Sequence, residues 1–193
     1  MALTFLESIL CQLTELDVSK NINLDYLNIE GNYLTNIDVS KNTALTNLAC
    51  GANYLTNIDV SKNVALLTLS CSKNQLESLD VSKNVALLNL YCAENQLTEL
   101  NVSKNTELTI LNCSDNQLTN LNLSKNTALQ SVALENNKLS KDALNELFDT
   151  LHDNTSSRSF SKGIYIEGNL GENDSNKSIA ENKDWTFKQI IRF

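Results

Sequence analysis

The sequence contains no proline and only five glycines among its 193 residues, so it lacks the composition of a flexible or proline-stiffened linker. We therefore expect one continuous unit rather than domains joined by a tether. The single histidine, His152, lies in a polar stretch where we expect it to be solvated. The sequence shows no Ser-His-Asp grouping, glycine-rich phosphate loop or metal-binding motif. These absences predict a protein that is not an enzyme and that uses no cofactor and no metal.

Basic residues are also scarce. The chain has 15 Lys and Arg against 23 Asp and Glu, which gives a net charge of -8. Duplex binding requires clustered positive charge to displace counterions, so we expect no nucleic-acid partner. The opening MALTFLESILCQ is apolar but has no basic start and is interrupted by Glu7, which predicts neither a signal peptide nor membrane insertion. On this reading either the protein is not exported or a leader has been removed.

The sequence does contain a regular repeat. LDVSKN or IDVSKN recurs every 21 residues and loosens to LNVSKN and LNLSKN near the end. The copies begin at Leu16, Ile37, Ile58, Leu79, Leu100 and Leu121. A fixed period of this length predicts a solenoid, in which each turn buries its apolar face only against its neighbours.

The other half of each repeat has its own pattern, L-x-x-L-x-C/I/L-x-x-N-x-L. It reads LTNLACGANYL from Leu45 and LLTLSCSKNQL from Leu66. Over residues 3 to 139 the chain therefore resembles leucine-rich repeat proteins of a short bacterial class with 21-residue repeats. The resemblance implies an α/β solenoid: a right-handed, gently curved superhelix with a parallel β-sheet on its concave face.

We number the positions of each turn from its first leucine, so that Leu24 stands at position 1. Residues 3 to 13 fit the same register as a degenerate first turn, with Leu3, Leu6 and Leu13 on core positions, and seven turns result. The alternation L-D-V in the second half of each turn predicts a second short strand or an extended segment on the convex side.

The repeat ends at Leu139, and we expect a solenoid over 1–139 and a capping region over 140–193. Ser140 is a candidate N-cap for a helix to about Leu151, with one apolar stripe. A strand from Gly163, a short helix from Ser178 and a final apolar strand follow. This tail resembles the segment that closes such repeats in cell-surface proteins of Bacteroides-like bacteria, which implies an extracellular or cell-surface location; a cytoplasmic one stays open.

Asparagine and cysteine form two columns within the repeats. An Asn recurs at position 9, where a buried amide can donate to and accept from the backbone of adjoining turns, so we expect a structural ladder. Its members are Asn32, Asn53, Asn74, Asn95, Asn116 and Asn137. Cys50, Cys71, Cys92 and Cys113 occupy core-facing position 6, where ligands cannot converge on one metal; we expect buried, unpaired thiols.

Two charged columns follow on the convex side. Lysines stand at position 18 and aspartates at position 15, the latter replaced by Asn101 and Asn122 in the last turns. The lysines are Lys20, Lys41, Lys62, Lys83, Lys104 and Lys125; the aspartates are Asp17, Asp38, Asp59 and Asp80. This stripe can be a docking surface for a polyanion, a calcium-binding array or a solvated face of offsetting charges, and the last is favoured.

Positions 3 and 5 face outward from the sheet, where leucine-rich repeat proteins usually carry specificity. They are rich in amides and hydroxyls, which resembles a protein- or glycan-binding surface more than a catalytic cleft. The candidate ligand-binding residues are Tyr26, Asn28, Asn47, Ser70, Asn89, Tyr91 and Asn112.

The sequence therefore predicts a non-catalytic scaffold that binds a protein or glycan through its concave face, with adhesion or host interaction as a role and a monomer as the favoured state. The alternative is a structural spacer or self-associating module.

Overall fold

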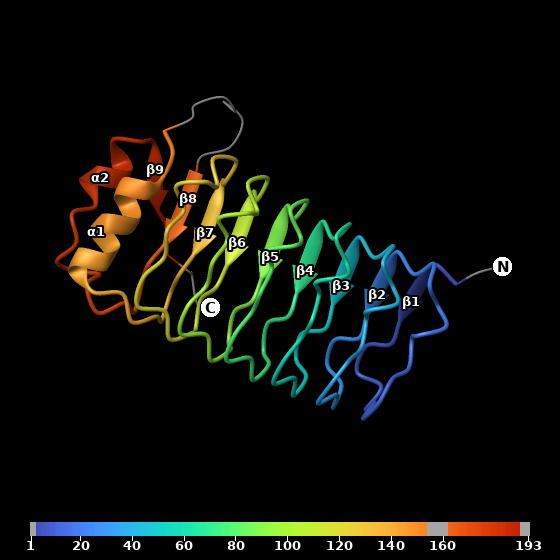
Figure 1. Ribbon diagram of the computed structural model, residues 1–193. Coiled ribbons are helices and arrows are strands. Elements are labelled where there is room, and N and C mark those ends of the chain that lie inside the picture. The colour runs from blue at the N-terminus through green and yellow to red at the C-terminus, as the bar shows by residue number, and fades with distance from the viewer. Residues whose placement is uncertain (1–2, 154–161, 190–193) are drawn as a thin grey trace.

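The computed structural model describes residues 3–153 and 162–189. Nine parallel strands form one sheet in chain order, and Figure 1 shows them side by side from the N-terminal end to the helices at the C-terminal end. The strands are β1 (Phe5–Glu7), β2 (Tyr26–Asn28), β3 (Asn47–Ala49), β4 (Thr68–Ser70), β5 (Asn89–Tyr91), β6 (Ile110–Asn112), β7 (Ser131–Ala133), β8 (Lys162–Tyr165) and β9 (Trp185–Phe187). The predicted leucine-rich repeat solenoid with a parallel sheet on its concave face is confirmed.

The strand register follows the repeat, because each residue of one strand pairs with the equivalent residue of the next turn. Leu27 pairs with Leu48, and Leu48 pairs with Leu69. This alignment stacks the apolar positions into columns that are almost completely buried, so each turn is covered on both sides by its neighbours. The core is a continuous strip along the axis of the stack rather than a central globule.

The first turn does form β1, but its packing differs from the prediction. Leu6 and Leu13 are partly buried against the core, whereas Leu3 is 43% exposed and Leu10 is 77% exposed. No described residue covers this end of the stack, so a leucine at a core position of the first turn has a neighbour on one side only. The prediction that Leu3 belongs to the core is wrong for this reason.

The convex side contains no strand among the described residues, so of the two predictions only the extended segment stays compatible with the structure. Each turn instead closes here with a tight turn at VSKN, in which the N–H of Asn42 donates to the carbonyl of Val39 (2.9 Å). The asparagine that ends this motif is buried in every turn from Asn42 on. These buried asparagines form a second column that was not among the predicted features.

The predicted helix after the repeats is confirmed as α1 (Lys141–Thr150). Its N-cap is Ser140, whose hydroxyl accepts the N–H of Ala143 (3.2 Å), and Leu144, Leu147 and Phe148 are buried. The cap also includes α2 (Ser178–Glu181). Figure 1 shows both helices at the C-terminal end of the stack. Part of the expected polar loop and the end of the final apolar segment lie outside the described residues.

The cap also contains an eighth turn, one more than the seven predicted from the repeat. In β8, Ile164 pairs with Val132 of β7. Asn169 then takes the place of a position-9 asparagine, because its Oδ1 accepts the N–H of Leu139 (3.1 Å) and its Nδ2 donates to the carbonyls of Leu134 and Ile166. The helix α1 is inserted between the two turns and lengthens the spacing, which hides the repeat.

Candidate ligand-binding face

The concave face is built from positions 3, 5 and 7 of successive turns. Positions 3 and 5 come from the strands, and position 7 follows immediately after each strand. The predicted ligand-binding positions do not include position 7, whose side chains also line the face. Its residues are Ile9 in the first turn, then Glu30, Gly51, Ser72, Ala93, Ser114, Glu135 and, in the eighth turn, Glu167. Small residues thus run along the middle of this column, between the carboxylates of Glu30 and Glu135.

The first carboxylate of this column makes a contact that crosses two turns. Glu30 Oε1 accepts the hydroxyl of Ser70 (3.0 Å), although the two residues are 40 positions apart. The contact passes over Gly51, where an added Cβ would lie 3.1 Å from the same Oε1 atom and 3.0 Å from the Ser72 carbonyl. Gly51 therefore leaves the space that Glu30 uses, and the predicted ligand contact Ser70 is engaged inside the protein.

Three predicted asparagines are also engaged by their neighbours. Asn28 is buried; its Oδ1 accepts the N–H of Glu30 (3.1 Å) and its Nδ2 donates to the Tyr26 hydroxyl (3.4 Å), so the expectation that it faces solvent is wrong. Asn89 bonds Thr68 and Thr109 in the flanking turns. Asn112 Oδ1 accepts both the N–H and the hydroxyl of Ser114.

The remaining predicted contacts are more available. Asn47 and Tyr91 are half-buried, and neither side chain makes a hydrogen bond to the described residues. Tyr26 stacks flat on Phe5, with ring centroids 4.5 Å apart. A second aromatic pair, Tyr33 and Tyr54 at position 10, has centroids 6.1 Å apart, and both rings are nearly half exposed. The face thus offers aromatic surface in its N-terminal half and one aromatic ring near its centre.

The second carboxylate, Glu135, is 3% exposed, and neither of its oxygens has a hydrogen-bond partner among the described residues. Burial is the main reason that the pKa of Glu135 lies above its usual value, and nearby Asp115 and Glu167 raise it further. A protonated carboxyl is the form that such a setting favours, since an ionised group pays a desolvation penalty without compensation.

The asparagines of position 9 connect adjacent turns beneath the face. In Asn74, Oδ1 accepts the N–H of Leu55 (2.9 Å) in the preceding turn, and Nδ2 donates to the carbonyls of Cys50 and Cys71. The same set of contacts recurs along the column. Such bonds satisfy backbone groups that the strand ladder does not reach, which is what a structural ladder requires.

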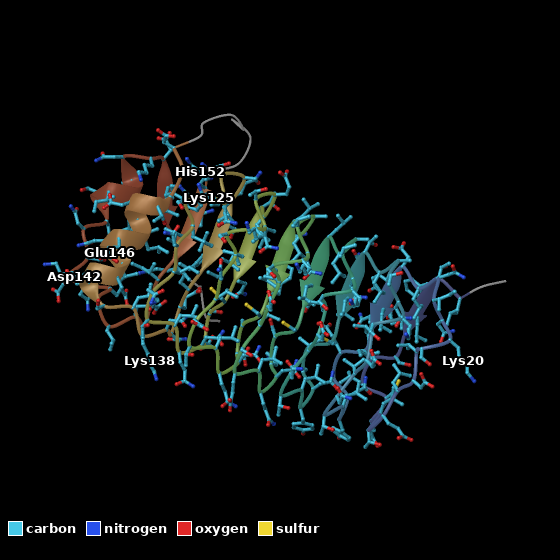
Figure 2. All side chains as sticks on the ribbon, in the orientation of Figure 1. Lys20, Lys125, Lys138, Asp142, Glu146 and His152 are labelled. Atoms are coloured by element: carbon cyan, nitrogen blue, oxygen red, sulfur yellow. The ribbon has the colours of Figure 1, made fainter. Side chains whose placement is uncertain are left out.

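The position-6 cysteines Cys50, Cys71, Cys92 and Cys113 are buried and unpaired, as predicted. Figure 2 shows sulfur atoms following the axis of the stack. Burial raises the pKa of the Cys71 and Cys113 thiols to about 12, so these groups stay protonated at neutral pH. The described residues contain no group of three or more His, Cys, Asp or Glu side chains placed to hold a metal ion.

His152, labelled in Figure 2, is not the solvated residue that we expected. Its Nε2 lies 2.8 Å from the carbonyl of Leu129, and its ring meets the Trp185 ring edge to face. The Trp185 indole N–H donates to the His152 carbonyl (3.0 Å). Burial lowers the pKa of His152, which therefore joins the cap to the last repeat as a neutral side chain.

No helix in the described parts of the chain is long and apolar enough to cross a lipid bilayer. No protein-family model and no curated protein matches the sequence. Solved structures do match it, and they include internalins and other leucine-rich repeat proteins.

The functional domain of InlJ from Listeria monocytogenes, a structure described as including a cysteine ladder, is 29% identical over 96% of this chain and 43% of its own, with a TM-score of 0.67. Internalin C2 from Listeria monocytogenes is 21% identical over 96% of this chain and 80% of its own, with a TM-score of 0.79.

The leucine-rich repeat protein LIC12759 of Leptospira interrogans is 21% identical, with a TM-score of 0.74, over 89% of this chain and 44% of its own. The chain thus spans less than half the length of two of these three structures. The similarity to InlJ runs through nearly the whole chain, and the stacked strands and aligned repeats of this protein form a leucine-rich repeat solenoid.

Proposed function

We propose that this protein is a non-catalytic recognition scaffold that binds a protein or glycan ligand through its concave face. One observation carries the proposal: Tyr91 stands half-exposed near the middle of a continuous sheet face, and its hydroxyl is not used by the described residues. Aromatic side chains of this kind supply large contact area at low cost in conformational entropy. Asn47, with an uncommitted amide two turns away, adds directional hydrogen bonding.

The internal bonds of the face refine the set of contacts. Asn28, Ser70, Asn89 and Asn112 already hold neighbouring side chains, so they position the surface and supply at most their remaining polar atoms to a ligand. A face whose polar groups are mutually bonded is already ordered, and less conformational entropy is lost on binding. An extracellular or cell-surface location, with a role in adhesion or host interaction, fits such a scaffold and belongs to the same proposal.

A structural spacer is the second candidate, and the uncovered N-terminal end favours it. Phe5 is 55% exposed there, next to the exposed side chains of Leu3 and Leu10. An apolar end with an unpaired strand edge is suited to stacking on another unit. In that case the face itself would carry no ligand.

The test is a screen of the protein against protein and glycan arrays, followed by variants assayed on the ligand found. Tyr91→Ala should weaken binding by about 2 kcal/mol, or roughly thirtyfold, while the thermal midpoint changes little because the ring is half exposed. Lys125→Ala on the convex side is the matched control and should leave both unchanged. Binding that survives Tyr91→Ala but is lost in Lys125→Ala would place the ligand on the convex side and refute the proposal.

A further inference from the structure

Two hollows mark the convex side of the stack, at positions 12 to 18 of the turns that line them. The larger, of about 690 Å³, includes Leu79 and Leu100 in its lining. The smaller, of about 360 Å³, includes Leu16 and Ile37 at the same position of earlier turns. Largely the same positions line both hollows, so both lie on the same side of the stack, at different turns. We call the two hollows together the convex groove.

Members of the aspartate and lysine columns line this groove, namely Asp17, Asp38, Asp80 and Lys104. All ten side chains of the two columns are exposed. The one ion pair within residues 3–153 and 162–189 joins Lys73 to Glu94 (3.4 Å), and both residues lie outside the columns. No lysine of the column donates a hydrogen bond to a described residue. Figure 2 labels the first and last members, Lys20 near β1 and Lys125 toward the cap. Two parallel rows of opposite charge thus lie beside a groove without being paired to each other.

The aspartates carry full charge in this arrangement. In Asp38, Oδ1 accepts the N–H of Ser40 (2.8 Å), and this bond is the main reason that its pKa lies below its usual value. Asn101 makes the same bond to Ser103 (3.0 Å) without a charge. The backbone turn therefore needs only a side-chain oxygen, and the negative charge at Asp38, Asp59 and Asp80 is not required for the turn.

We propose that the convex groove is the docking surface for a second copy of this chain, with the lysine column of each copy lying against the aspartate column of the other. A matching period is the reason to choose this partner. Neighbouring turns repeat at about 4.8 Å, the spacing of paired strands, whereas an extended peptide repeats its same-side residues at about 6.6 Å and falls out of step. A second copy repeats its charged residues with the same spacing.

The arrangement of the two columns also fixes the symmetry. A two-fold axis parallel to the stack keeps each turn at the same height and exchanges the sides of the groove, so aspartates of one copy face lysines of the other. A two-fold axis across the stack would leave aspartate facing aspartate. The contact is therefore isologous, with the two stacks running in the same direction. Four turns contribute a Lys–Asp pair in each direction, at Asp17, Asp38, Asp59 and Asp80.

Sedimentation equilibrium of the unmodified chain tests this. We expect a monomer–dimer equilibrium at about 20 mM salt that weakens at about 0.5 M, because exposed charges are screened over a shorter distance. A lysine-neutral variant (Lys41→Gln, Lys62→Gln, Lys83→Gln) should weaken dimerisation by about tenfold or more, given the usual strength of several exposed pairs. An aspartate-neutral variant (Asp38→Asn, Asp59→Asn, Asp80→Asn) should do the same and stay folded.

Mixing the two variants gives the sharpest result. The mixed dimer keeps the lysines of one chain against the aspartates of the other, so the mixture should associate more tightly than either variant alone. Lys73→Gln and Lys138→Gln, outside the column, should leave dimerisation unchanged, and circular dichroism should show every variant folded. A chain that stays monomeric at low salt overturns the proposal. The proposal is also overturned if neither triple variant weakens dimerisation, or if the mixture associates no more tightly than either variant alone. A monomer whose lysine column binds a polyanion would overturn it as well.

Discussion

Asn74→Ala is the most direct test of the asparagine ladder, because its cost can be worked out bond by bond. In the parent, Asn74 Oδ1 accepts the N–H of Leu55 (2.9 Å), and Nδ2 lies 3.1 Å from the Cys50 carbonyl and 3.0 Å from the Cys71 carbonyl. Both carbonyls keep another donor after the change, since Asn53 and Asn95 also reach them. The buried N–H of Leu55 has no such replacement.

One stranded N–H costs about 1–3 kcal/mol, and the other lost bonds and packing bring the expected loss to about 2–4 kcal/mol. For a chain of this size that corresponds to a thermal midpoint lower by roughly 5–15 °C. Chemical denaturation followed by circular dichroism measures the free energy of unfolding independently. The slope of that transition should stay unchanged if only the native contacts are affected.

The second asparagine column provides the matched comparison. Asn84 donates to the carbonyls of Val60 (3.0 Å) and Asn63 (2.9 Å), but both carbonyls also accept a backbone N–H, and its Oδ1 has no partner among the described residues. Asn84→Ala therefore strands no donor and should cost only about 1 kcal/mol. An equal or larger loss in Asn84→Ala than in Asn74→Ala would refute the reasoning, because the stranded N–H would then not be the dominant cost.

Three further changes test the buried and strained positions. Cys71 and Cys92 should react with a bulky thiol reagent only after unfolding, and labelling of the native protein at the unfolded rate would contradict their placement. Burial raises the folded-state pKa of Glu135, so its contribution to stability is present at acid pH and is lost as the pH rises through the folded pKa. Glu135→Gln should therefore gain stability relative to the parent as the pH rises from acid to neutral, as thermal midpoints across that range would show. Ala52 has a φ of 50°, a left-handed conformation that costs a residue with a Cβ about 1 kcal/mol. Ala52→Gly should therefore raise the free energy of unfolding by about that amount. A free energy of unfolding below that of the parent would argue against the backbone geometry.

Much of the site geometry could not be predicted from the sequence. The contact of Glu30 with Ser70 joins residues two turns apart and depends on the missing side chain of Gly51. Asn28 occupies an outward position by its phase in the repeat, yet its amide is used by Glu30 and Tyr26. The position of a residue within the repeat predicts the direction in which its side chain leaves the strand. It does not predict which neighbouring group that side chain contacts.

Two features that were not predicted, the second asparagine column and the eighth turn, do have signals in the sequence. The asparagine that ends VSKN recurs at a fixed phase as regularly as the position-9 asparagine, and the same argument would have predicted its burial. The segment from Ile164 to Asn169 repeats the apolar and Asn spacing of the other turns, but α1 lengthens the interval before it. A search for the spacing within a turn, rather than for the interval between turns, would have found the eighth turn.

The sequence by itself determined the solenoid, its parallel strands, the burial of the cysteine column and Ser140 as the N-cap of α1. It could do so because a repeat carries its long-range contacts in its period: each residue meets its own equivalent in the next turn. Only the tertiary structure decided which outward polar groups bond to their neighbours, that Glu135 is buried with no hydrogen-bond partner among the described residues, and that Leu3 is exposed. Those outcomes depend on the departures from the repeat and on its ends, where the period no longer specifies what a side chain meets.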